Sequence, residues 1–331
     1  MLLKQFKGTG PGTISLIVVT LLMVWASAFI KLQEQFSLYF DLYSMPLYGI
    51  LSSIIGTNPL PGIIFTLSLV SLMAFFLVNL NTTLFFINKR TLFPAVIYIL
   101  LSGLFPQYQL LNPAIFGAMF LMLAIRRIMN TYRVQGTAYS FFDAAICISV
   151  GSLFYANLIW FGSLFIIGMS LLRTGSIKEV VISVIGLITP YAITFGIYYL
   201  LGYDLKDLLS LMKYNLFEKP DSYVYTPLTI AAVAIIGLVT LASISHLLML
   251  MNAKKIKSRK TFNLLIWLFL ISIVVYIVFP SVSVEIVWIL GIPVSYFLAH
   301  YFEFIRKKLI SEILFSVIFL IVLVIQIWYL I

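Results

Sequence analysis

Apolar stretches of about 15 to 27 residues alternate with short polar or basic segments along almost the whole chain. These stretches predict eleven helices, at 14–30, 61–87, 92–106, 113–129, 139–155, 157–173, 180–201, 227–251, 262–280, 284–301 and 309–330. They lack two-residue alternation and exceed the roughly ten residues of a membrane-barrel strand. We therefore predict an all-α, polytopic transmembrane helix bundle of about 11 helices, forming a single membrane domain over residues 1–331.

Four consecutive stretches, from 92 to 173, are shorter than the roughly 20 residues that cross a hydrocarbon core. They form two tight hairpins, joined at 106–113 and at 155–157. Short helices imply local thinning of the bilayer or shelter by neighbouring helices. We expect the two hairpins to leave a depression on the outer face.

Composition supports a membrane location, because 62% of the residues are hydrophobic and only 10% are charged. An ordinary soluble domain has roughly a quarter charged residues. The sequence therefore predicts a multi-pass integral membrane protein, with lipid as its main partner. The net charge of +10 would suggest nucleic acid in a soluble chain, but loop asymmetry accounts for it here without such a partner.

The basic residues predict the orientation. Seventeen of the 21 Lys and Arg residues follow an even number of predicted crossings: Lys4, Lys7, Lys89, Arg90, Arg126, Arg127, Arg133, Arg173, Lys178, Lys254, Lys255, Lys257, Arg259, Lys260, Arg306, Lys307 and Lys308. The positive-inside rule then places the N-terminus in the cytoplasm and the C-terminus in the periplasm. The four on the other face are Lys31, Lys206, Lys213 and Lys219.

Two outer stretches are long enough to hold structure. In the first, from 31 to 60, aromatic residues recur at helical spacing: Phe36, Tyr39, Phe40 and Tyr43. This spacing predicts one or two interfacial helices lying on the membrane. The second stretch, from 202 to 227, is predicted to begin as an amphipathic helix and to end as a loop.

Acidic residues influence topology only weakly, so their positions are freer to report function. Seven of the eleven are expected outside: Glu34, Asp41, Asp204, Asp207, Glu218, Asp221 and Glu285. Glu34 and Asp41 are seven apart, which on a helix places both on nearly the same face, roughly 10 Å apart. One of them could act as a general base or metal ligand with an acid from the second outer stretch. Alternatively, both form the solvated side of an interfacial helix.

Three further titratable residues are expected to have structural roles. Asp143, near the start of a short helix, is expected to form an ion pair with Arg126, Arg127 or Arg133. His246 and His300 are expected to be interfacial or interhelical hydrogen-bonding groups, since no second His or Cys stands at metal-ligand spacing. The sequence identifies no metal site and no cofactor.

The order of parts resembles the membrane glycosyltransferases of the GT-C class. In that class one helix is followed by an outer loop with juxtamembrane helices and an acidic catalytic residue. Glu34 and Asp41 stand in that loop here, although Asp41 is flanked by Phe40 and Leu42 and not by a second acid. The chain also resembles a family of polytopic inner-membrane proteins of unknown function from Bacteroidota. This resemblance implies a location in the bacterial inner (cytoplasmic) membrane.

Three functional interpretations follow. The first is a transferase using a polyprenyl-linked sugar. In this interpretation Asp41 or Glu34 deprotonates the acceptor hydroxyl or holds a divalent metal, and Lys206 and Lys213 bind the substrate phosphate. The second is a non-enzymatic membrane subunit of an envelope-biogenesis or secretion complex, with other membrane proteins as partners. The third is a lipid or solute transporter, although inverted repeats and buried ionisable groups are scarce.

Overall fold

A computed structural model describes residues 2–32, 43–55, 58–132, 137–172, 177–219 and 225–331. These residues form helices and connecting segments, and no strand occurs among them. The eleven predicted segments correspond to α2 (Pro11–Ile30), α5 (Pro59–Leu84), α6 (Phe93–Ser102), α7 (Pro113–Asn130), α8 (Ala138–Ser152), α9 (Ser163–Leu172), α10 (Ile177–Leu200), α12 (Pro227–Leu250), α13 (Ile256–Val278), α14 (Val287–Phe304) and α15 (Lys308–Leu330). The protein is an all-α helical bundle, as predicted.

Eight of these helices are long and apolar enough to cross a membrane: α2, α5, α7, α10, α12, α13, α14 and α15. The other three, α6, α8 and α9, are shorter, as predicted, whereas α7, which was also predicted to be short, is long enough at 18 residues. The protein is therefore a multi-pass membrane protein.

Several helices begin at capping residues that the sequence supplies. The side chains of Asn58 and Asn112 accept hydrogen bonds from backbone N–H groups at the starts of α5 and α7. Thr226 and Thr229 form a reciprocal capping box at the start of α12. A proline follows each of these three caps, at a position where the missing N–H has no helical partner to lose.

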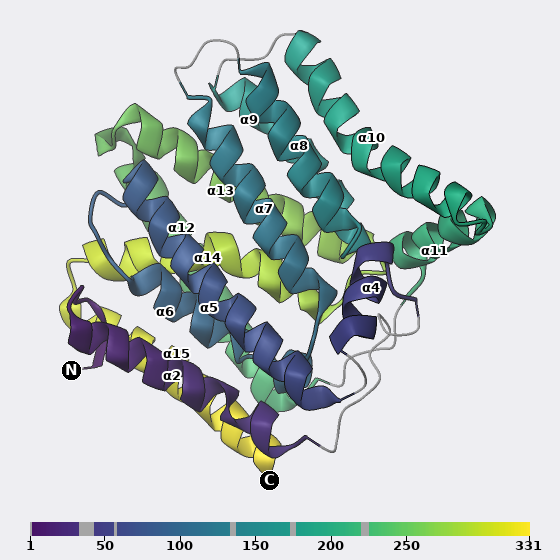
Figure 1. Cartoon of the computed structure of the whole chain (residues 1–331). Coiled ribbons are helices and arrows are strands. Elements are labelled where there is room, and N and C mark those ends of the chain that lie inside the picture. Colours follow the sequence, from purple (N-terminus) through teal and green to yellow (C-terminus); the bar gives the residue numbers. More distant parts are fainter. Residues whose placement is uncertain (1, 33–42, 56–57, 133–136, 173–176, 220–224) are drawn as a thin grey trace.

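The centre of the bundle is formed by α6 and α14. All ten residues of α6 are buried, and most of α14 is buried as well. Helix α14 contacts α6, α7, α12 and α13. Helices α2 and α15 lie side by side along one edge, while α10 forms the opposite edge and packs mainly on α8 (Figure 1).

Ionic contacts join distant segments at one end of the bundle. The Glu303 carboxylate pairs with Lys89, and its Oε2 lies 4.0 Å from the Lys7 Nζ. The Arg127 Nη1 lies 3.6 Å from the Asp143 Oδ2, which confirms the ion pair predicted for Asp143. We call this the basic end. The opposite end, with α4 (Pro46–Ile55) and α11 (Leu205–Phe217), we call the loop end (Figure 1).

The loop end contains the two outer stretches. Helix α11 occupies the start of the second stretch, as predicted, and Asp204 caps it by accepting from the Lys206 N–H at 2.8 Å. In the first stretch, α4 is described, whereas residues 33–42 lie outside the described residues.

Both hairpins contain segments between their helices that are not α-helical. The first, 103–112, includes the 3₁₀ turn η1 (Pro106–Tyr108), and the second includes η2 (Ala156–Gly162). Side chains from other helices donate hydrogen bonds to backbone carbonyls of the first segment. The Gln326 Nε2 donates to the Gly103 carbonyl at 2.6 Å, and the Thr66 hydroxyl donates to the Leu110 carbonyl at 3.1 Å. Irregular backbone within a membrane protein is tolerated where neighbouring protein supplies such partners.

Candidate functional site

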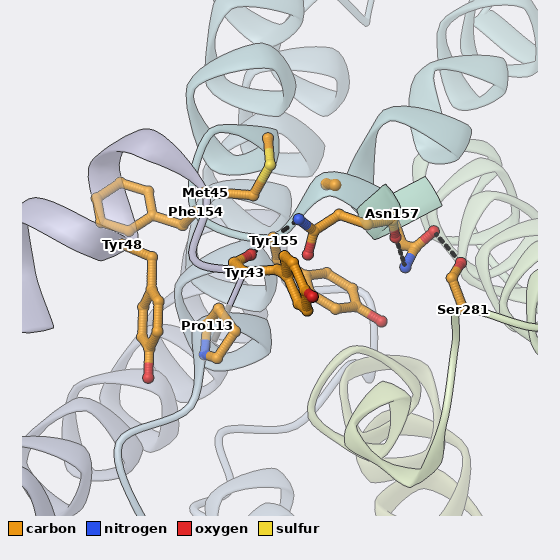
Figure 2. Close-up of a pocket in the computed structure, with 10 residues that line it drawn as sticks. Tyr43, Met45, Tyr48, Pro113, Phe154, Tyr155, Asn157 and Ser281 are labelled. Atoms are coloured by element: carbon orange, nitrogen blue, oxygen red, sulfur yellow. Dashed lines mark hydrogen bonds between the residues drawn. The ribbon is translucent and has the colours of Figure 1, made fainter. Parts of the chain in front are cut away.

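A small recess lies at the loop end, where both hairpins meet the first outer stretch and the connection between α13 and α14. Its lining includes Tyr43, Tyr48, Tyr155, Asn157, Asn215 and Ser281 (Figure 2). These residues come from segments far apart in the sequence, and they bring several polar groups together. This convergence makes the recess our candidate site.

A buried carboxylate lies directly behind the recess. Glu285 belongs to the 3₁₀ turn η4 (Val284–Ile286) that leads into α14, and its side chain is only 1% exposed. Its Oε1 accepts from the Ser283 N–H at 2.9 Å and from the Tyr155 hydroxyl at 3.2 Å, while its Oε2 accepts from the Ser283 hydroxyl. Within the described residues, Glu285 has no ion pair.

Such an arrangement has an energetic consequence. Burying a carboxylate without a cation is costly, and hydrogen bonds offset only part of that cost. Ser283 supplies two of these bonds and Tyr155 of the second hairpin supplies the third. The first hairpin takes part indirectly, because the Tyr108 hydroxyl lies 3.1 Å from the Ser283 Oγ. An ionisable residue buried among membrane helices is a functional-site candidate by default.

Asn157 organises the other side of the recess. Its Nδ2 donates to the Asn215 carbonyl at 3.2 Å, and its Oδ1 accepts from the Ser281 hydroxyl at 3.1 Å (Figure 2). The Trp160 indole N–H also donates to this Oδ1, at 3.3 Å, and the Trp160 ring stacks on Phe279 with centroids 3.9 Å apart. The amide therefore links η2 to α11 and to the end of α13.

Hydrogen bonds and ring stacking hold the first outer stretch over the residues around Asn157 and Glu285. The Asn215 Nδ2 donates to the Tyr43 carbonyl at 2.9 Å, and the Tyr43 and Tyr214 rings stack at 4.0 Å. The Tyr48 hydroxyl donates to the Leu111 carbonyl of the first hairpin at 3.1 Å. As a result the enclosed space is about 10 Å³, enough for about one water molecule. A larger ligand therefore needs the first outer stretch to move.

Comparison with known proteins identifies the family. A model described as a family of unknown function, DUF6427, matches residues 14–330. The chain belongs to this family. No curated protein and no solved structure matches it. The DUF6427 match runs from within α2 to the last residue of α15, so the whole recess lies inside the family region.

The described lining of this DUF6427 recess contains none of the four predicted site residues. Glu34 and Asp41 lie outside the described residues, although Asp41 stands two positions before Tyr43 in the sequence. Lys206 and Lys213 are both exposed on α11 and do not line the recess. Their assignment as substrate-binding residues stays a prediction, as does the catalytic assignment of the two acids.

Sequence reasoning placed Glu285 among the outer acids but did not select it. The available signal was a polar break of serines and one acid, 281–285, between two apolar stretches. Nothing in that break indicates that Tyr155, from another hairpin, covers the carboxylate. Among the described residues, no group of three or more His, Cys, Asp or Glu side chains could hold a metal ion.

Proposed function

We propose that the protein is a membrane transferase that acts on a polyprenyl-linked sugar at the loop end. The observation that carries this proposal is the attachment of Tyr43 to Asn215 and Tyr214 above the residues around Glu285. This attachment holds Tyr43, which follows Asp41 by two positions in the sequence, over a polar recess that lies in front of the buried Glu285 carboxylate. A lipid-linked substrate would reach such a recess from the membrane.

The chemistry assigned to each group follows from its type. Asp41, or Glu34 in its place, would take the proton from the acceptor hydroxyl as the sugar is transferred. Glu285 and Asn157 would hold the residues around the recess in a fixed geometry. Lys206 and Lys213 would steady the departing polyprenyl phosphate through charge.

The test replaces Asp41 with Asn in a cell whose envelope glycans depend on the gene. Loss of a general base lowers a reaction rate by about 10²- to 10⁴-fold, so we expect the glycan product to fall by at least about a hundredfold at unchanged protein level. The Asp207→Asn variant is the matched control, because Asp207 is an exposed acid on α11 that does not line the recess. Normal glycans in the Asp41→Asn variant would remove Asp41 as the base, and normal glycans in a variant that also carries Glu34→Gln would overturn the proposal.

A second function is favoured by a different observation. Only 17% of the spanning part of α10 is buried, and a shallow groove of about 420 Å³ runs along Ile185, Ile188 and Ile193. This face would suit a helix of another membrane protein in an envelope or secretion complex. Gentle detergent purification with mass spectrometry tests it: a stoichiometric partner protein supports a subunit role, whereas a lone chain carrying a polyprenyl-linked sugar supports the transferase.

A further inference from the structure

A second cluster of polar groups, at the basic end, plays no part in the recess. His246 on α12 and His300 on α14 face each other with ring centroids 6.2 Å apart. Lys254 follows α12, and its Nζ lies 5.1 Å from the centroid of Phe262 and 5.3 Å from that of Phe304. The same two rings contact His300, at 5.3 and 4.8 Å. His300 and Lys254 therefore share two aromatic neighbours, and His246 lies beside His300.

In the described part of the chain, three of the four ring nitrogens of these histidines have no hydrogen-bond partner. His300 is fully buried, and neither of its ring nitrogens has a hydrogen bond; the Nδ1 of His246 also lacks one. This differs from the sequence expectation that these histidines hydrogen-bond between helices. Because buried polar groups in native structures are nearly always paired, these nitrogens indicate that a polar ligand belongs here.

The charge of the surroundings selects the kind of ligand. No carboxylate in the described part of the chain forms an ion pair with Lys254. The nearest acid along α14, Glu303, is already occupied by Lys89 and Lys7. Burial lowers the pKa of Lys254 to about 8, which indicates that water stabilises its charge poorly. A cation next to unpaired N–H donors, without a carboxylate, is suited to an anion.

The cluster opens to the surface of the bundle. His246 and Lys254 are half-buried, and Phe304 is 38% exposed. The neighbouring turn of α12 exposes apolar side chains, including Leu248 and Met249. At this position an apolar helix gives way to the basic segment 254–260, as happens where a membrane helix passes the level of the lipid headgroups.

We propose that His246, His300 and Lys254 form a binding site for the phosphate group of an anionic phospholipid. The phosphate accepts hydrogen bonds from the imidazole N–H groups and from the Lys254 ammonium. The acyl chains lie along the exposed apolar face of α12. Basic pockets between transmembrane helices are known to hold lipid headgroups by this chemistry. The site is independent of the transferase proposal, since it lies at the other end of the bundle.

The test measures lipid binding to the delipidated full-length protein in detergent by native mass spectrometry. Phosphatidylglycerol should bind at least about tenfold more tightly than phosphatidylcholine. The Lys254→Gln variant loses one hydrogen bond to a charged group, so it should bind phosphatidylglycerol about tenfold or more weakly. Lys255→Gln is the matched control, because it removes the same charge from an exposed neighbour, and it should bind like the wild type.

A second variant distinguishes loss of the binding site from misfolding of the Lys254 variant. His246→Gln, at a half-buried position, should weaken phosphatidylglycerol binding in the same direction. Equal binding of the two lipids, or equal loss in the Lys254 and Lys255 variants, would overturn the proposal. Inorganic phosphate, added in a separate arm, distinguishes the sources: displacement of the lipid at equal concentration would assign the site to soluble phosphate, and its failure would assign it to the lipid headgroup.

Discussion

The Tyr155 hydroxyl donates a hydrogen bond of 3.2 Å to the Glu285 carboxylate, across 130 positions of the sequence. Both side chains are almost completely buried, at 4% and 1% exposure. The bond joins the second hairpin to the start of α14, which is one of the two central helices. It therefore couples the candidate site to the stability of the bundle.

Removing this hydroxyl should destabilise the protein. A hydrogen bond to a charged group contributes about 1.5 to 3 kcal/mol, so Tyr155→Phe should lower the free energy of unfolding by that amount. Tyr199→Phe, at a residue that is 73% exposed on α10, should leave it unchanged. Reversible unfolding in mixed detergent measures both, and a double-mutant cycle with Glu285→Gln should show coupling of about 0.5 to 3 kcal/mol. Additive effects would mean that the two groups act separately.

Two glycines on α10 provide a matched test of its packing. A Cβ at Gly186 would lie 2.8 Å from the Ala145 Cβ and 2.9 Å from the Phe142 carbonyl oxygen, whereas a Cβ at Gly196 would meet nothing within 4 Å. Overpacking should make Gly186→Ala less stable by about 1 to 3 kcal/mol. Gly196→Ala should gain up to about 1 kcal/mol from helix propensity. Thermal unfolding of both variants in one detergent checks this, and equal stability would show that α10 does not pack closely on α8.

Lys254 should make stability depend on pH. Its pKa is lowered by burial from 10.5 to about 8, so between these values the unfolded chain binds more protons than the folded chain. The free energy of unfolding therefore rises with pH across this window. Lys254→Met should remove that rise and should be more stable than the wild type at pH 7, with the advantage shrinking towards pH 10. Lys255→Met serves as the exposed control in the same thermal unfolding series, and a constant difference across the window would refute the prediction.

Cysteine labelling tests the predicted orientation. In a Cys147→Ser background, Lys213→Cys on α11 should react with a membrane-impermeant maleimide in cells whose outer membrane is opened. Lys255→Cys should react only after the inner membrane is broken. Both positions are exposed in the folded chain, so burial does not bias the comparison. The reverse order of labelling would place the basic end in the periplasm.

The helices were predictable because each carries a continuous apolar stretch, which reaches membrane length in eight of them. Boundaries differed where charge interrupted the pattern: the helix predicted from 262 begins at Ile256, since the basic residues of its first turns are helical but not apolar. The structure divides the predicted stretch 157–173 into η2 and α9. The sequence did not show this division, because a 3₁₀ turn leaves no distinct hydrophobic signature. The Asp143 ion pair was predictable because its three candidate partners are close in the sequence.

The recess was less predictable because its contacts connect distant segments. Tyr155 and Asn157 of the second hairpin line the recess, and Tyr43 and Asn215 cover it from elsewhere in the chain. Periodicity reports which face of a helix is apolar but not which buried acid a distant tyrosine contacts. Glu285 was therefore visible only as one acid among seven.

The complete burial of α6 has a consequence for biosynthesis. The Tyr98 hydroxyl of α6 donates to the Trp288 carbonyl of α14, which is synthesised 190 residues later. Until α14 emerges from the ribosome, α6 lacks part of its final surroundings and must remain against lipid or the insertion machinery. The centre of this protein is therefore completed late in translation, and a chain truncated before α14 should be recognised as unassembled and degraded.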